Sequence, residues 1–178
     1  MLPDNELIAK VIAHNDSHAF ALLVKRYQSN IRQFLRRLTA GDYAMADDLA
    51  QDCFMTAFEK LAQYNGSGSF SSWLHTLAYR RFLRVIQTGA QKYEIPCDVS
   101  WQKLTTKDST DQDILAESLM SYLDVKERTV ITLSCADGMS HNEIAQVTGI
   151  PLGTVKSHIA KAKQKLHDLM SKDSVEAS

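Results

Sequence analysis

The stretch that decides the fold of this chain is residues 140–166, SHNEIAQVTGIPLGTVKSHIAKAKQKL. Ser140 and Glu143 have the spacing of a capping box, in which each side chain satisfies a free backbone N–H group at the start of a helix. Gly149 can adopt the left-handed conformation that ends a helix, and Pro151 favours entry into a second helix directly after it. The stretch therefore predicts two short helices joined by a tight turn.

The second of these helices has an apolar stripe and a cationic outer face. Its apolar residues recur at steps of three and four, the period of one buried helix face: Val155, Ile159, Ala162, Leu166 and Leu169. The rest of its surface, up to residue 166, carries lysines and no acid. A small helix pair with a cationic outer face fits the major groove of B-form DNA, so we predict a DNA-reading helix-turn-helix. The alternative is an ordinary helical hairpin with a solvated lysine face.

The length and charge of the chain limit the number of domains and the kinds of partner that it can have. Its 178 residues suffice for one medium domain or two small ones. The formal net charge is only -1, so the molecule as a whole is no general polyanion binder, yet its charges are segregated. One basic group contains Lys25, Arg26, Arg32, Arg36 and Arg37, and the other contains Arg80, Arg81, Arg84 and Lys92. The acidic segment contains Asp42, Asp47, Asp48, Asp52 and Glu59. Opposed patches of this kind indicate several partners of different charge.

The cysteines and histidines give no sign of a disulfide framework or a metal site. Cys53, Cys97 and Cys135 are far apart and odd in number. Cys53 and Cys135 lie in apolar helical surroundings, so we expect both to be buried. His14 and His18 have no obvious third ligand, so we expect no metal and no cofactor. The N-terminus lacks a signal-peptide pattern and no apolar run reaches membrane-spanning length, which predicts a cytoplasmic protein without membrane insertion.

Helical periodicity runs through nearly the whole chain, without convincing strand alternation. We expect helices over about residues 4–14, 17–40, 42–61, from Ser71 or Ser72 to 87, and 111–122. Asp124 and Glu127 form a second capping box, which opens a helix that Gly138 ends. Residues 65–69 (NGSGS) have the composition of a loop.

Residues 89–110 differ in character from the helical segments on either side. They include Gly89 and Pro96 and have no sustained period, so we predict a flexible linker there. The predicted fold is therefore all-α. It consists of a helical domain over residues 1–88, the linker over 89–110, a helix-turn-helix domain over 111–172 and a tail over 173–178.

The order of these segments resembles the sigma-70 family of bacterial transcription initiation factors, specifically its small two-domain extracytoplasmic-function (ECF) group, over most of the chain. Residues 48–54 (DLAQDCF) resemble the segment by which the family's first domain binds the clamp helices of core RNA polymerase. Residues 70–74 (FSSWL) resemble the start of its promoter-melting helix. Residues 123–128 and 138–165 resemble its second domain, which binds the −35 element of the promoter.

The chain departs from the family pattern at four positions. The family usually has asparagine where Arg80 stands and aspartate where Arg84 stands, so both changes add positive charge to a helix expected near DNA. His158 and Lys161 stand where arginines are more usual. Lysine cannot make a bidentate fork to guanine as arginine does. The resemblance therefore implies DNA binding but leaves the recognised bases open.

For the −35 element, we assign Lys156, Ser157 and Lys161 to base edges or adjacent phosphates, because the N-terminal half of a recognition helix enters the groove deepest. Thr154 and the free N–H groups of the helix start should hold a phosphate. His158 is either a further DNA contact or a neutral surface histidine. For each of these residues, the alternative is plain solvation.

For core polymerase, we assign Asp48, Gln51 and Asp52, which project from one side of an otherwise apolar helix, to a basic partner helix. The alternative is that these side chains serve helix-end electrostatics and solubility.

For the −10 element, the polar loop that includes Asn65 and Ser69 lies beside two aromatic residues, Phe70 and Trp73. This combination suits the capture of an unstacked base, although core packing is the strong alternative for both aromatic rings. The strand backbone would be held by three arginines: Arg80, Arg81 and Arg84.

These features predict a sigma factor, a dissociable subunit that directs core RNA polymerase to specific promoters. One domain would read the single-stranded −10 element and the other the duplex −35 element, and the family resemblance implies an anti-sigma factor as inhibitor. The alternative is a stand-alone helix-turn-helix regulator of the response-regulator or quorum-sensing type. Such regulators carry βα alternation or a ligand domain in their N-terminal half, whereas this chain shows helices. No catalytic constellation is present, so we expect no enzyme.

Overall fold

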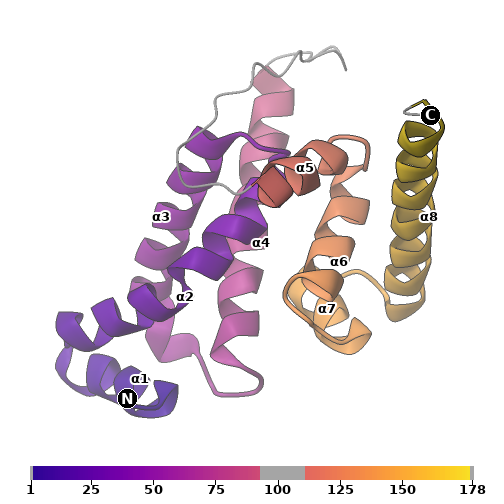
Figure 1. Ribbon diagram of the computed structural model, residues 1–178. Coiled ribbons are helices and arrows are strands. Elements are labelled where there is room, and N and C mark those ends of the chain that lie inside the picture. Colours follow the sequence, from indigo (N-terminus) through magenta and orange to yellow (C-terminus); the bar gives the residue numbers. More distant parts are fainter. Residues whose placement is uncertain (1, 93–110, 177–178) are drawn as a thin grey trace. The chain divides into compact units, whose positions relative to one another are not determined.

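The computed structural model describes residues 2–92 and 111–176, and these residues are helical or in turns (Figure 1). No strand occurs among them, which confirms the all-α prediction. The helices are α1 (Asp4–His14), α2 (Ser17–Leu38), α3 (Tyr43–Lys60), the short 3-10 helix η1 (Leu61–Gln63), α4 (Phe70–Lys92), α5 (Asp111–Met120), α6 (Val125–Cys135), α7 (His141–Thr148) and α8 (Leu152–Glu176). None of the described helices combines the length and the hydropathy needed to cross a membrane.

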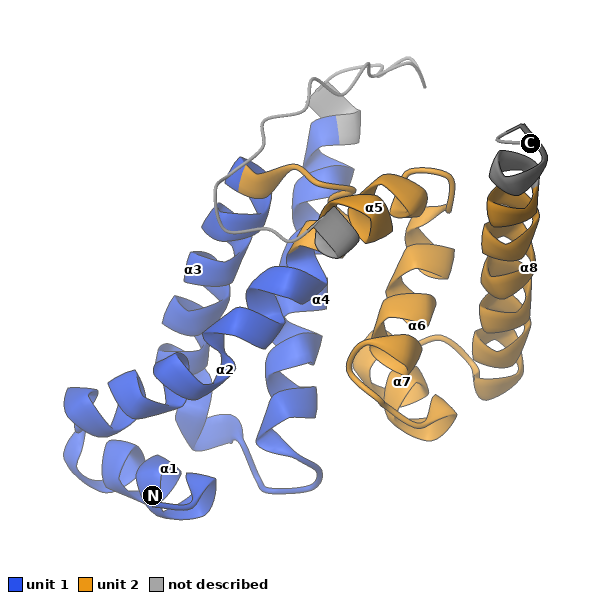
Figure 2. Ribbon diagram, in the orientation of Figure 1, with its two compact units in different colours: residues 1–35, 44–104 blue, residues 36–43, 105–178 orange. Residues whose placement is uncertain are grey.

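The chain divides into two compact units (Figure 2). The first comprises residues 1–35 and 44–104, and the second comprises residues 36–43 and 105–178. The assignment of residues 36–43 to the second unit was not predicted, because nothing in their local pattern separates them from the helices on either side.

The first unit is built around α2, α3 and α4. Small residues on α3 let the neighbouring helices approach closely, and all are buried: Ala46, Ala50, Cys53 and Ala57. The Sγ atom of Cys53 lies 3.6 Å from the carbonyl oxygen of Leu74 on α4. Burial raises the pKa of the Cys53 thiol to about 12. The prediction of a buried Cys53 is therefore confirmed.

The second unit contains the helix-turn-helix. Both predicted capping boxes are present, at Asp124–Glu127 before α6 and at Ser140–Glu143 before α7. Gly149 ends α7 in the left-handed conformation, with φ 73°. The core is formed by apolar residues of α6, α7 and α8: Val130, Ile131, Leu133, Ile144, Val147, Val155, Ile159 and Ala162. In the predicted apolar stripe of α8, the last two members, Leu166 and Leu169, are only half-buried.

Three local predictions need correction. Helix α4 begins at Phe70, because the Oγ atom of Ser69 caps it by accepting the backbone N–H of Ser72 at 3.0 Å. It continues to Lys92, so residues 89–92 of the predicted linker are helical, and residues 93–110 lie outside the described part. Helix α8 continues to Glu176, which includes most of the predicted tail.

The remaining correction concerns the second described cysteine. Cys135 is exposed, whereas the sequence predicted burial. It is the last residue of α6, and its position at the helix end, rather than its apolar neighbours, decides its exposure.

Candidate nucleic-acid and polymerase interfaces

The helix-turn-helix is held by hydrogen bonds at both ends of α7. The carboxylate of Glu143 accepts the backbone N–H of Ser140 at 2.8 Å and its hydroxyl at 2.8 Å. Hydrogen bonding to Ser140 lowers the pKa of the Glu143 carboxyl, because it favours the charged form. In the turn, the Oγ1 atom of Thr148 accepts the backbone N–H of Ile150 at 3.2 Å. These bonds fix the direction in which the chain enters α8.

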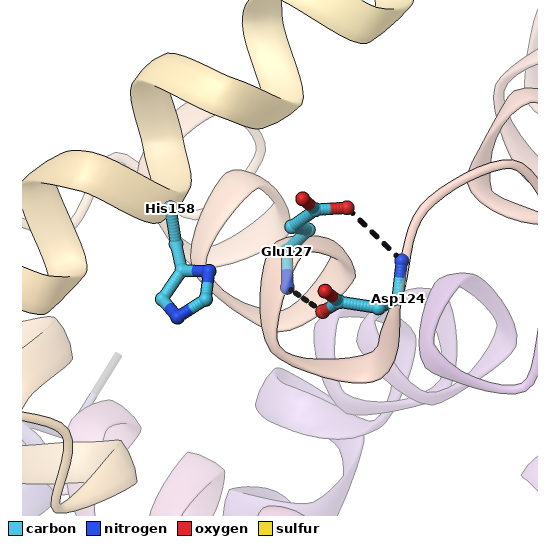
Figure 3. A group of neighbouring side chains, drawn as sticks. All are labelled: Asp124, Glu127 and His158. Carbon is cyan, nitrogen blue, oxygen red and sulfur yellow. Dashed lines mark hydrogen bonds between the residues drawn. The ribbon is translucent and has the colours of Figure 1, made fainter.

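The predicted −35 residues divide into two sets on α8. Thr154, Lys156, Ser157 and Lys161 are exposed, as a groove contact requires. Lys156 and Lys161 pair with no acid among the described residues. His158 is half-buried instead, and its ring faces the start of α6 (Figure 3). The structure therefore separates His158 from the outward-facing residues with which it was grouped.

His158 faces two acidic side chains, Asp124 and Glu127. One ligand atom from each of the three residues lies within 4.8 Å of the other two, a spacing that could hold a metal ion. The carboxylate of Glu127 already accepts a hydrogen bond from the Nζ atom of Lys165, at 2.7 Å, so the ammonium group of Lys165 is the cation beside this carboxylate. We assign no metal to this group.

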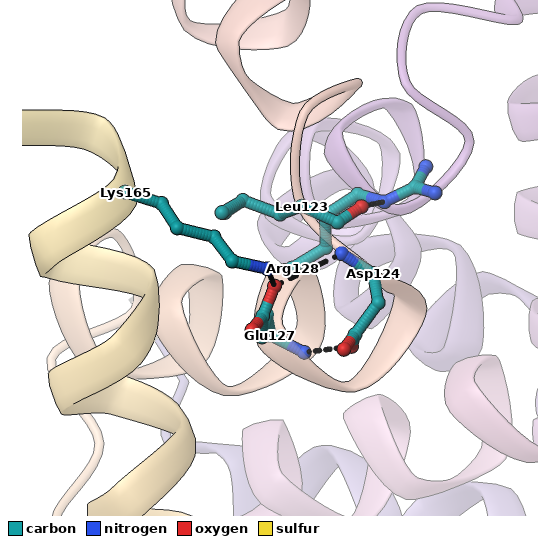
Figure 4. Close-up of polar contacts among 5 residues, drawn as sticks. All are labelled: Leu123, Asp124, Glu127, Arg128 and Lys165. Carbon is teal, nitrogen blue, oxygen red and sulfur yellow. Dashed lines mark hydrogen bonds and ion pairs between the residues drawn. The ribbon is translucent and has the colours of Figure 1, made fainter. Parts of the chain in front are cut away.

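The contact between Lys165 and Glu127 was missed by the sequence reasoning. Glu127 is only 3% exposed and accepts both the backbone N–H of Asp124 at 3.1 Å and the ammonium group of Lys165 (Figure 4). It thereby ties α8 to the first turn of α6. Lys165 was counted with the cationic outer face, but its charge is directed at the protein. A buried acid that precedes its lysine partner by 38 residues leaves no local signal in the sequence.

In the first unit, an apolar groove of about 560 Å³ lies along α2 and α3. Its apolar lining comes from Phe20, Val24, Ala50, Phe54, Met55 and Phe58. Asp48 and Gln51 also line it, and both are exposed. Met55 is 57% exposed, so the groove offers accessible apolar surface. Two of the predicted polymerase-binding residues, Asp48 and Gln51, thus border an unfilled apolar surface, which sequence reasoning did not foresee.

Asp52, the third predicted polymerase-binding residue, is engaged within the protein. Its Oδ2 atom accepts a hydrogen bond from the Nη2 atom of Arg81 on α4, at a distance of 2.9 Å. Arg81 was predicted to bind the DNA backbone together with Arg80 and Arg84, which are both exposed. The structure therefore brings together two residues that were assigned to different partners.

The loop before α4 is ordered by its own hydrogen bonds. The Oδ1 atom of Asn65 accepts the backbone N–H and the hydroxyl of Ser67 at 3.0 and 2.7 Å. The hydroxyl of Tyr64 donates to the carbonyl oxygen of Gly68 at 2.7 Å. Asn65 and Ser69 are both exposed.

The aromatic residues after this loop pack together. Phe70 is 4% exposed, and its ring centroid lies 5.4 Å from that of Tyr27, 5.5 Å from that of Tyr64 and 5.6 Å from that of Trp73. Phe70 is therefore a core residue, and of the two predicted base-capturing rings only Trp73, which is half-buried, has substantial exposed surface. Packing against Tyr27 of α2 and against Tyr64, which follows η1, decides this burial.

A second hollow, of about 550 Å³, lies between α1 and the loop. Its lining includes Asn5 and Ile8 of α1 and Gly66 and Ser69 of the loop. The hydroxyl of Tyr27, also in the lining, donates to Asp4. Burial, and then the hydrogen bond to Asp4, raise the pKa of Tyr27 to about 12. The involvement of α1 was not predicted.

Comparison with known proteins finds a matching family model in each of the two units. The family model for sigma-70 region 2 matches residues 23–91, and the model for sigma-70 region 4 matches residues 114–166. The chain is 25% identical to the ECF RNA polymerase sigma-E factor of Haemophilus influenzae, covering 94% of this chain and 95% of that protein. It is 28% identical to the ECF RNA polymerase sigma factor SigW of Bacillus subtilis (88% and 91%) and 27% identical to SigE of Mycolicibacterium smegmatis (88% and 63%).

Two solved structures share the fold. The sigma factor RpoE in complex with the anti-sigma factor NepR from Bartonella quintana superposes with a TM-score of 0.73 at 22% identity, covering 85% of this chain and 96% of that one. CnrH in complex with the cytosolic domain of CnrY gives 0.71 at 24% identity, covering 96% and 98%. With region 2 matched in its N-terminal half, region 4 in its C-terminal half and ECF sigma factors as its relatives, this chain belongs to the ECF group of the sigma-70 family.

Proposed function

We propose that this chain is a sigma factor, which gives core RNA polymerase its promoter specificity and leaves the polymerase after initiation. The observation that carries the proposal is the presence of region 2 and region 4 in one chain, each with an exposed set of polar side chains suited to a different partner. Its work is done by binding energy in the cytoplasm, and the chain itself catalyses no reaction.

The −35 element is the proposed target of α8. Lys156, Ser157 and Lys161 are exposed in the first half of α8, which carries no acid before Asp168, and they would contact base edges or neighbouring phosphates. Thr154 and the first N–H groups of α8 would hold a phosphate. His158 would act indirectly, since it faces α6.

Core polymerase is the proposed partner of α3. A basic amphipathic helix would place its apolar side chains in the groove beside Phe54 and Met55 and its cations against Asp48, Gln51 and Asp52. The groove supplies the apolar area that charge pairing alone lacks, because exposed ion pairs contribute only about 0–1 kcal/mol each.

The −10 element is the proposed ligand of the loop and α4. Trp73 offers a partly exposed ring, with Phe70 packed behind it, and Asn65 and Ser69 offer exposed polar groups. Stacking of an unpaired base on such a ring is worth about 1–3 kcal/mol, which offsets part of the cost of unpairing. The backbone of the strand would be held by Arg80, Arg81 and Arg84.

An anti-sigma factor is the proposed inhibitor. The solved structures of similar fold contain sigma factors in complexes with the anti-sigma factor NepR and with the cytosolic domain of CnrY. In this chain, the apolar groove on α2 and α3 would be covered by such a partner, which would exclude polymerase. The stand-alone regulator is the weaker alternative, because region 2 occupies the part of the chain where a receiver or ligand domain would lie.

Affinity for core RNA polymerase tests this proposal. The wild-type chain should bind purified core enzyme. Met55→Ala should weaken binding about tenfold, since hot-spot truncations cost more than about 1 kcal/mol, and Asp48→Ala should weaken it by at most about fivefold, as expected of an exposed ion pair. Glu59→Ala is the matched control, because Glu59 is an exposed acid on α3 outside the groove lining. A wild-type chain without affinity for core enzyme would overturn the proposal.

A further inference from the structure

The ion pair between Asp52 and Arg81 joins two surfaces that the proposed function assigns to different partners. Asp52 belongs to the polymerase-binding set on α3, and Arg81 belongs to the DNA-binding set on α4. Their side chains are 49% and 33% exposed, and their charged groups are 2.9 Å apart. Both groups can therefore be reached from solvent, but in the free protein each already holds an ionic partner.

The direction of Arg81 distinguishes it from its neighbours. Arg80 and Arg84 are four residues apart, so they lie on one face of α4, and both are exposed. Arg81 is one residue further round the helix and points towards α3. Its Nε atom is buried and makes no hydrogen bond within the described part of the chain. The guanidinium is thus only partly satisfied by Asp52, and it could turn outward to a stronger anion.

We infer that the Asp52–Arg81 pair is an exchangeable contact that couples polymerase binding to DNA binding. A cation of the polymerase that takes Asp52 releases Arg81 to a DNA phosphate, and a phosphate that takes Arg81 releases Asp52. Because coupling between two ligands is reciprocal, each raises the affinity for the other by the same factor. The inference rests on the proposed function, since that function supplies both partners.

The expected size of the coupling follows from the exposure of the pair. Partly exposed ion pairs change an equilibrium constant by a factor of about 1.4 to 5, and salt screens them. We expect a factor of about three at low ionic strength, in the middle of that range. Such a factor is measurable when matched variants are compared.

The first test measures binding of the full chain, without polymerase, to a fluorescein-labelled single-stranded DNA 20-mer of mixed sequence. Asp52→Asn should raise affinity about threefold more than Asp48→Asn, which removes the same charge from the same helix without freeing an arginine. In an Arg81→Gln background, the two asparagine variants should have equal effects. Equal effects in the wild-type background would overturn the inference, because general electrostatics would then explain the gain.

The salt dependence of the same binding gives an independent readout. In the Asp52→Asn background, Arg81→Gln should flatten the slope of log K against log salt by about 0.7, because it removes one phosphate contact, and Asp48→Asn should leave the slope of the wild-type chain unchanged. Circular dichroism verifies the helical content of each variant. If Asp52→Asn loses its fold, Asp52→Ser replaces it and carries the same expectation.

The second test measures the reverse direction with core polymerase. Arg81→Gln should bind core enzyme about threefold more tightly than Arg80→Gln, because only the former frees Asp52. Equal affinities of these two variants would overturn the inference while leaving the proposed function intact, provided that the wild-type chain binds core enzyme. If the wild-type chain does not bind core enzyme, the proposed function is wrong and the inference falls with it.

Discussion

Glu127 is the buried acid that attaches α8 to the rest of the second unit, and its replacement by alanine should be costly. Its carboxylate accepts the backbone N–H of Asp124 at 3.1 Å and the Nζ atom of Lys165 at 2.7 Å (Figure 4). The substitution removes half of the capping box of α6 and the only acid among the described residues that pairs with Lys165. Both losses fall where the DNA-reading helix is held.

The magnitude can be estimated from these contacts. Loss of the cap costs about 1 kcal/mol. Loss of a buried charged hydrogen-bond acceptor adds about 1–2 kcal/mol. Lys165 is half-exposed and regains water, so its side of the pair contributes little. The total is about 2–3 kcal/mol for Glu127→Ala, and about 1 kcal/mol for Glu127→Gln, whose amide oxygen can still accept the Asp124 N–H.

Urea denaturation of the full chain, followed by circular dichroism, measures this difference in the free energy of unfolding. Glu143→Ala is the matched control, because Glu143 completes the capping box of α7 near the surface and pairs with no lysine in the described part of the chain. It should cost only about 1 kcal/mol. If Glu127→Ala costs no more than Glu143→Ala, the buried carboxylate of Glu127 adds nothing beyond its cap and the reasoning is wrong.

Three further outcomes are expected. Lys156→Ala and Lys161→Ala should each reduce the salt slope of duplex promoter binding by about 0.9, if each lysine contacts one phosphate; unchanged slopes in both would remove α8 from the DNA interface. At pH 8, iodoacetamide should alkylate Cys135 and spare Cys53, because the thiol of Cys53 is buried and has a pKa of about 12; modification of Cys53 in the folded protein would contradict its placement. In a spectrophotometric titration, Tyr27 should ionise near pH 12, above the ordinary value of about 10. Because its folded pKa is raised, the neutral phenol contributes stability that is complete below about pH 10 and is lost as the pH rises towards 12, and replacement by phenylalanine should abolish that loss.

The local features of the fold were predictable because their causes lie within a few residues. Both capping boxes need only a polar residue and a glutamate three positions later, and the chain shows both as expected. Gly149 ends α7 because a left-handed residue is required directly after the helix. The prediction that residues 89–92 belong to the linker was wrong, because a helix can continue through Gly89 at a cost of about 1 kcal/mol relative to alanine.

Tertiary contacts, which the sequence does not show, decide the surroundings of several candidate site residues. Phe70 follows a polar loop, for which the sequence left both an accessible ring and core packing open, and Tyr27 of α2 together with the nearby Tyr64 covers it. Lys165 and Arg81 have the charge of DNA-binding residues, yet each is directed at an acid of its own unit. His158 lies on the cationic helix but is turned towards α6. Periodicity predicts which face of a helix is buried, and it does not predict which partner a long side chain at the edge of that face will choose.

The apolar groove on α2 and α3 is a second feature that depends on tertiary packing. The sequence predicted that Asp48 and Gln51 would be exposed, and they are. It could not predict that α2 and α3 leave an unfilled apolar surface beside these polar groups, because that surface depends on how the two helices pack. The groove strengthens the proposal of a polymerase interface more than the acidic residues do alone.

Transcription in vitro tests the central claim most directly. Purified core RNA polymerase, which starts transcripts at random without a sigma factor, is combined with this chain and a library of bacterial promoter fragments, and the 5′ ends of the products are sequenced. We expect initiation at defined positions with this chain as the sole specificity factor. Specific initiation that requires another sigma factor in the reaction would contradict the account and favour a stand-alone regulator.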